Sequence, residues 1–114
     1  MAQTSIKEMT HLDAVLEEVG YERERQDMRW GEQNHIDAAG MGDYDLVKSA
    51  LEARAVNQKL VQNKTMSWAA ILGEEVAEAF DEINEDEVAL RAELIQVAAV
   101  CVAWIQAIDR RNSK

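Results

Sequence analysis

The sequence contains no proline and only one cysteine, Cys101. Without proline, no residue of the chain is obliged to interrupt a helix. A single cysteine cannot form an internal disulfide. We also find no secretory signal or twin-arginine pattern at the start of the sequence. Together these features lead us to expect a protein of the reducing cytoplasm.

Basic residues are scarce, since 12 Lys and Arg stand against 22 Asp and Glu and the formal net charge is −10. No cluster of basic residues offsets this balance locally. A strongly acidic chain is repelled by the phosphate backbone of nucleic acids and by anionic membranes. We therefore expect neither nucleic acid nor a membrane among the partners of this protein.

Long hydrophobic segments are also missing. The most apolar run covers residues 97–105 and is bounded by Gln96 and Gln106, whereas a helix needs about 20 apolar residues to cross a bilayer. We interpret this run as part of a buried helix, and we expect the helix that contains it to be the most buried element of the fold.

Apolar residues recur three and four positions apart throughout the chain, and β-branched residues never alternate with polar ones. The pattern predicts a single all-α domain, residues 1–114, with about four helices. We expect a first helix that ends near Trp30 and a second that runs from about 44 to 64. A third should run from 68 to about 83, and a fourth should end near Arg110. Ser67 is expected to cap the third helix, and Asn84 with Glu87 resembles the capping box of the fourth.

Residues 73–87 contain eight carboxylates, which fall into two groups by their position around the predicted helix. With about 100° per residue around a helix, Glu75 lies inside the apolar sector and Glu78 lies at its edge. Most of the others, including Glu74, lie outside this sector and are explained by a solvated face. A glutamate on the buried side of a helix must be paired, protonated or bound to a cation.

The following apolar helix contains a similar interruption, Glu93 and Gln96, also spaced three apart. Two antiparallel helices would bring this pair opposite Glu75 and Glu78 and form an oxygen-lined site of the kind that Mg²⁺ prefers. An equally good interpretation is a structural ion-pair network in which nearby basic residues neutralise the glutamates. The basic residues that could do so are Arg54, Lys59 and Arg91.

The spacing of these acids resembles a known signature. The segment "EEVAE" (74–78) is followed after fourteen residues by "ELIQ" (93–96), which is similar to the Glu-Glu-x-x-Glu and Glu-x-x-Asp motifs of the MazG-like all-α nucleoside triphosphate pyrophosphohydrolases. The resemblance implies a helical bundle completed by oligomerisation, as a homodimer or homotetramer. It also implies hydrolysis of an NTP or dNTP to the monophosphate and pyrophosphate.

By the same resemblance, Glu75, Glu78, Glu93 and Gln96 occupy the positions that bind Mg²⁺, for which Mn²⁺ is an alternative. Glu74 lies next to them and is our candidate for the general base, so that Glu74, Glu75 and Glu78 form the catalytic set. Gln96 departs from the family, because its carboxamide brings an oxygen ligand but no charge. We expect weaker metal binding as a result.

The segment "ERERQDMRWGEQNH" is similar to the part of the family that closes over the nucleotide base, although the spacing after the tryptophan is one residue longer than expected. This similarity places Trp30, Gln33 and His35 near the substrate. Lys59 and Lys64 are candidate contacts to the phosphates. The alternative is that Trp30 is a packing anchor, His35 an ordinary loop residue, and the lysines part of a solvated face.

Two other functions are compatible with the sequence. One is a non-catalytic helical module that binds nucleotides or another protein and has lost a metal-ligand carboxylate at Gln96. The other is a related bundle that acts on a different pyrophosphate, such as a phosphoribosyl nucleotide, although no residue of this chain favours that substrate.

Overall fold

The computed structural model describes residues 9–39, 49–63 and 66–113. In these residues the chain forms four packed α-helices and no β-strand, only an isolated bridge between Ile36 and Ser67. The prediction of an all-α fold with about four helices is confirmed. The helices are α1 (His11–Trp30), α2 (Ala50–Gln62), α3 (Trp68–Asp81) and α4 (Glu87–Asn112).

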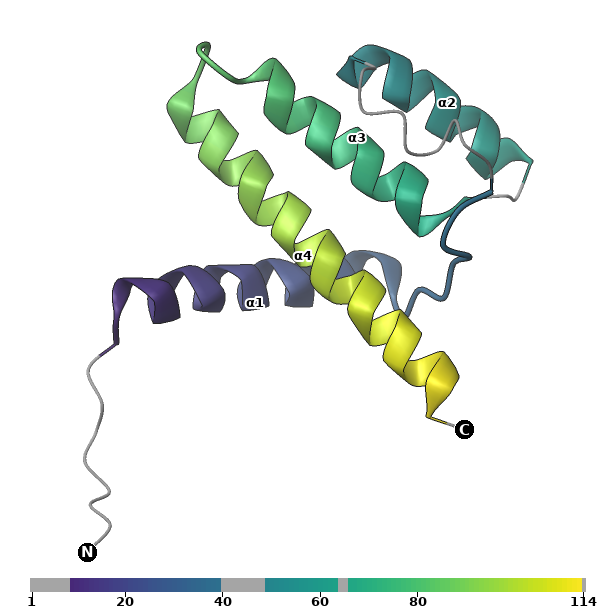
Figure 1. The fold of residues 1–114 in the computed structure, drawn as a ribbon, viewed down its shortest axis with the longest axis horizontal. Coiled ribbons are helices and arrows are strands. Elements are labelled where there is room, and N and C mark those ends of the chain that lie inside the picture. Colours follow the sequence, from purple (N-terminus) through teal and green to yellow (C-terminus); the bar gives the residue numbers. More distant parts are fainter. Residues whose placement is uncertain (1–8, 40–48, 64–65, 114) are drawn as a thin grey trace, which may run out of the picture.

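Helices α3 and α4 form an antiparallel hairpin (Figure 1). Helix α2 packs on the side of α3 that faces away from α4, and α1 crosses behind the middle of α4. Helices α3 and α4 each contact two other helices, and they contact each other most extensively. The acidic motif of residues 74–78 therefore lies on one of the two inner helices of the fold.

The helix starts follow from side-chain capping. Ser67 accepts a hydrogen bond from the backbone N–H of Ala70 and begins α3, as predicted. The predicted capping box at Asn84 is wrong. Asn84 has a positive φ of 66° and lies in the turn after α3, and Asp86 caps α4 by accepting from the N–H groups of Val88 and Ala89.

Helix α2 begins later than predicted. Its start at Ala50 is fixed by Ser49, which has an extended backbone and accepts a hydrogen bond from the N–H of Glu52. The expected start near residue 44 falls among residues 40–48, which lie outside the described part of the chain. Its end at Gln62 is close to the expected one.

Small side chains make up most of the core. One buried cluster combines Trp68 at the start of α3 with Val100, Ala103 and Ala107 of α4, and a second combines alanines of α2 and α3. Short alanine side chains fill much of both interfaces, and α3 packs directly against α2 and α4.

The expectation that α4 is the most buried helix is wrong. Four of its 26 residues are buried, against five of the 14 residues of α3. An 18-residue window of α4 has a mean hydropathy of 1.8, and 17% of that window is buried, so by length and composition alone this helix could cross a membrane. The same test is passed by core helices of soluble proteins, and it is weak evidence for a membrane span.

Candidate functional site

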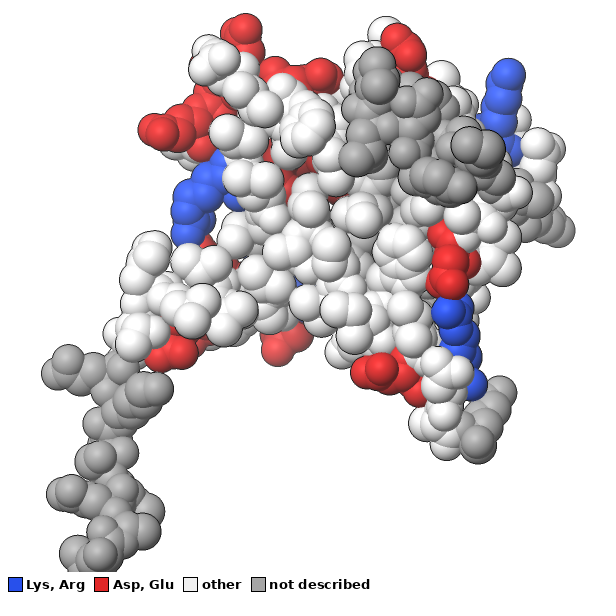
Figure 2. Space-filling view, in the orientation of Figure 1, with Lys and Arg blue, Asp and Glu red and all other residues white. Residues whose placement is uncertain are grey.

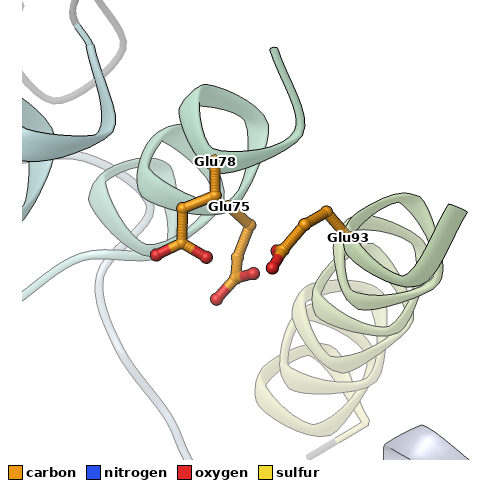
Figure 3. Close-up of side chains that lie close together, drawn as sticks. All are labelled: Glu75, Glu78 and Glu93. Atoms are coloured by element: carbon orange, nitrogen blue, oxygen red, sulfur yellow. The ribbon is translucent and has the colours of Figure 1, made fainter. Parts of the chain in front are cut away.

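Three glutamates converge in the space between α3 and α4. Glu75 and Glu78 extend from α3 and Glu93 extends from α4, with their carboxylates turned toward one another (Figure 3). One carboxylate oxygen from each residue lies within 4.8 Å of the others. All three side chains are partly buried. The structure therefore brings together three of the four residues that the sequence pattern assigned to a metal.

Helical geometry explains this arrangement. Glu75 and Glu78 are three residues apart, so their side chains leave α3 from the same face. The turn at residues 82–86 reverses the chain, and α4 then returns along α3 with Glu93 in its second turn (Figure 1). The site thus depends on the register of the hairpin.

Protonation is strongly shifted at the centre of this cluster. Burial raises the pKa of Glu75 to about 8, and the negative charges of Glu78, Glu93 and Glu74 add to the effect. The pKa of Glu93 is also raised, mainly by burial and next by the negative charge of Glu78. A carboxyl group that holds its proton near neutral pH, as Glu75 does, marks a place where negative charges lie close together without enough compensation.

Only part of that charge is neutralised by basic residues. Arg54 of α2 approaches Glu78, with 3.2 Å between Nη2 and Oε1. Arg91, which the ion-pair interpretation also invoked, pairs instead with Glu18 of α1. Glu93 Oε2 is buried and has no hydrogen-bond partner among the described residues. Within the described part of the chain, the ion-pair interpretation therefore accounts for Glu78 but gives Glu75 and Glu93 no basic partner.

The chemistry of these ligands fits a hard divalent cation. Oxygen donors from carboxylates are what Mg²⁺ and Mn²⁺ select, and no histidine or cysteine joins the cluster. A cation at this point would satisfy the buried Glu93 Oε2 and favour the ionised form of Glu75. Gln96 lies one helical turn beyond Glu93 on α4 and is partly buried.

The cluster borders a large pocket of about 1530 Å³. This volume exceeds the roughly 300–1,000 Å³ of typical small-molecule sites, so the pocket is a wide cleft. It lies between the second half of α1, α2 and α3, and it reaches α4 at Gln96 and Val100. The acidic residues that line it are Glu22, Glu74, Glu75 and Glu78.

Several residues predicted near the substrate line this pocket. They are Trp30, Gln33 and His35. Gln33 Nε2 lies 3.1 Å from His35 Nε2, and the imidazole meets the Trp68 ring edge-on, with 5.1 Å between the ring centroids. Burial lowers the pKa of His35. Lys59 is exposed and does not line the pocket, and Lys64 lies outside the described residues.

Sequence reasoning missed most of the cations of the pocket. Arg25 and Arg29 of α1 line it, and so does Arg54, a cation of the second helix that the sequence offered for the phosphates but that was ranked behind Lys59 and Lys64. The spacing of four between Arg25 and Arg29 could have signalled a shared helix face. Trp68 was also missed as a pocket residue, because a tryptophan in an apolar stripe is indistinguishable from a core residue in the sequence.

Comparisons with protein-family models, with curated proteins and with solved structures find no match for this chain. Its function is therefore argued from the site itself.

Proposed function

We propose that this protein is a Mg²⁺-dependent nucleoside triphosphate pyrophosphohydrolase. The single observation that carries the proposal is the convergence of Glu75, Glu78 and Glu93 at the edge of a pocket wide enough for a nucleotide. The motifs "EEVAE" and "ELIQ", which supply these residues, are those in which the sequence resembles the MazG-like family. The described helices are compatible with such a bundle.

In this proposal Glu75, Glu78 and Glu93 hold the metal, with Gln96 as a neutral oxygen donor. When bound, Mg²⁺ neutralises phosphate charge and increases the acidity of a coordinated water. Glu74 lines the same pocket. The pKa of its carboxyl group is raised, mainly by burial and next by the negative charge of Glu78. A raised pKa makes a carboxylate a stronger base, which suits Glu74 for accepting a proton from the attacking water.

The phosphates of a nucleotide also need cations in the pocket. Arg54 lines the pocket, and its guanidinium lies beside Glu78, next to the proposed metal site. Arg25 and Arg29 line the pocket from α1. Guanidinium groups bind phosphate oxygens in pairs, which favours these arginines over the lysines of α2. Trp30, Gln33 and His35 then remain for the base and sugar.

The test is product analysis with a panel of the eight common NTPs and dNTPs in Mg²⁺ or Mn²⁺. Phosphorus NMR distinguishes monophosphate and pyrophosphate from diphosphate and orthophosphate. We expect the first pair of products, formed only when a divalent cation is present, and lost in Glu75→Gln. Glu85→Gln is the matched control, because Glu85 is an exposed residue of the turn. Formation of diphosphate would contradict the proposal.

Gln96 favours a second candidate, a non-catalytic module that binds nucleotides or a protein partner. Replacing an acid by a carboxamide removes one charge from the ligand set. In that case nucleotide would raise the melting temperature of the protein without being consumed. Nucleotide binding that is indifferent to Mg²⁺ and EDTA would favour this candidate over the hydrolase.

Self-association is part of the main proposal. Large apolar side chains remain exposed on α1 and α4, including Leu12 (64% exposed), Leu94 (51%) and Ile105 (57%). Figure 2 shows a broad uncharged face, with acidic side chains gathered near the turn between α3 and α4. A second copy of the chain would cover such a face and complete the bundle as a homodimer or homotetramer. Light scattering should give twice or four times the chain mass, and a monomer would refute this part.

A further inference from the structure

The loop of residues 31–39 carries two pocket residues, Gln33 and His35, but belongs to no helix. Its position therefore depends on contacts with other elements. Two of these are backbone hydrogen bonds, in which the N–H groups of Trp68 and Ala69 donate to the carbonyls of Ile36 (2.9 Å) and Asp37 (2.8 Å). These bonds attach the end of the loop to the start of α3.

The part of the loop next to the pocket is held by the last turn of α4. Arg110 Nη2 donates to the backbone carbonyl of Gln33 at 2.8 Å, and Arg110 Nε donates to Asn34 Oδ1 at 3.0 Å. One guanidinium thus bonds two consecutive loop residues, Gln33 through its backbone carbonyl and Asn34 through its side chain. Arg110 does not line the pocket itself.

Asp37 makes a second attachment to α4. Its Oδ1 accepts hydrogen bonds from Trp104 Nε1 at 2.8 Å and from Arg111 Nη1 at 3.1 Å, and its Oδ2 accepts from Arg111 Nη2 at 2.9 Å. The hydrogen bonds from Arg111 and from Trp104 hold the pKa of Asp37 below its usual range. The carboxylate therefore stays ionised at neutral pH and keeps both partners.

His35 lies between these two attachments. Its ring is partly buried, 3.1 Å from the Gln33 amide and edge-on to Trp68. We propose that Arg110 and Asp37 are positioning residues, which act through the loop to hold Gln33 and His35 in the substrate pocket. The inference rests on the proposed function in so far as the pocket binds a nucleotide, and it adds the end of α4 to the residues that determine substrate affinity.

The first test is the steady-state kinetics of Arg110→Ala and Asp37→Asn with the preferred nucleotide. We expect KM to rise about tenfold in each variant, equivalent to about 1.4 kcal/mol, while kcat stays within about twofold because the glutamate cluster is untouched. Arg110→Lys keeps the charge but not the paired geometry, and should recover part of the affinity. A fall in kcat with unchanged KM, in both Arg110→Ala and Asp37→Asn, would overturn the inference.

Arg91→Ala is the matched control. Arg91 lies on α4, as Arg110 does, but it pairs with Glu18 of α1. Neither member of this pair belongs to the loop of residues 31–39. Removal of the Arg91 side chain should leave KM unchanged. A rise in KM equal to that of Arg110→Ala would show that any lost ion pair between α4 and its neighbours has this effect, and would overturn the specific role of Arg110.

A second test needs no substrate. The chain has two histidines, and His11 is exposed at the start of α1, so NMR titration of the imidazoles can resolve His35 with an internal reference. In wild type we expect His35 to titrate below the ordinary value of 6.5 because of its burial. In Arg110→Ala and Asp37→Asn it should move toward 6.5, and in Arg91→Ala it should not move.

The two tests separate the failure of the inference from the failure of the proposed function. If wild type hydrolyses no nucleotide but His35 shifts in both variants, the proposed function fails and the positioning of the loop stands. If wild type is active but KM and His35 are unchanged in both variants, the inference fails and the proposed function stands.

Discussion

Glu75 and Glu93 belong to different helices, yet each places a carboxylate oxygen within 4.8 Å of the other. Both carboxyl groups have a raised pKa, in each case first because of burial. Such a pair costs stability unless a proton or a cation compensates it. Without metal, the proton that Glu75 retains up to about pH 8 supplies this compensation; in the function that we propose, a divalent cation takes its place.

The stability of the protein in EDTA should fall as the pH rises. Glu75 holds its proton up to about pH 8 in the folded chain, whereas its ordinary value is 4.5. Between these limits the folded state binds the extra proton, so the free energy of unfolding decreases with pH. We expect a loss on the order of 1 kcal/mol after allowance for solvent screening.

Calorimetric scans from pH 5 to 9 would measure this loss. Glu75→Gln cannot ionise, so its melting temperature should decline less than that of wild type over the same range. Parallel curves for the two proteins would mean that the Glu75 carboxyl group is not perturbed in the folded chain.

Gln96→Glu should strengthen the metal site. The substitution keeps the length of the side chain and adds a fourth carboxylate, as in the MazG-like motifs that the sequence resembles. We expect the Kd for Mg²⁺ to fall about tenfold, or about 1.4 kcal/mol. Gln106→Glu is the matched control on α4, since Gln106 is an exposed residue bonded to Arg23. Equal affinities in Gln96→Glu and wild type would place Gln96 outside the ligand set.

Arg54→Ala should weaken nucleotide binding. A hydrogen bond to a charged group contributes roughly 1.5–3 kcal/mol, so KM should rise at least about tenfold if Arg54 binds phosphate. Lys59→Ala, on the same helix, should behave like wild type because Lys59 does not line the pocket. A rise in KM in Lys59→Ala but not in Arg54→Ala would instead support Lys59 as a contact to the phosphates.

The capping of α4 can be tested by stability. Asp86→Ala removes the acceptor for two backbone N–H groups and should lower the free energy of unfolding by about 1 kcal/mol. Asn84→Gly should be neutral or slightly stabilising, because glycine adopts the positive φ of 66° more easily. Urea denaturation measures both. A larger loss in Asn84→Gly than in Asp86→Ala would restore Asn84 as the cap.

The helices and the acidic cluster could be predicted because both follow from local periodicity. The spacing of Glu75 and Glu78 places them on one face of α3, and the short connection to the next helix brings Glu93 back toward that face. Asn84 shows where this reasoning fails. Asn84 and Asp86 are both good capping residues, and only the backbone of the turn decides between them.

The pocket could not be predicted in the same way. It is formed by α1, α2 and α3 together, and the packing of α1 behind α4 sets which arginines face it. Arg110 is 77 residues from Gln33 and Arg111 is 74 residues from Asp37, and nothing in the local pattern relates the two members of either pair. Contacts of this kind depend on tertiary structure alone.

The most direct test of the account is calorimetric titration of Mg²⁺ into wild type, Glu75→Gln, Glu78→Gln, Glu93→Gln and the control Glu85→Gln. We predict that wild type and Glu85→Gln bind Mg²⁺ with the same affinity, and that each of the other three binds at least about tenfold more weakly. If Glu75→Gln and Glu93→Gln bind Mg²⁺ as tightly as wild type, the convergence of these glutamates is not a metal site and the central claim is wrong.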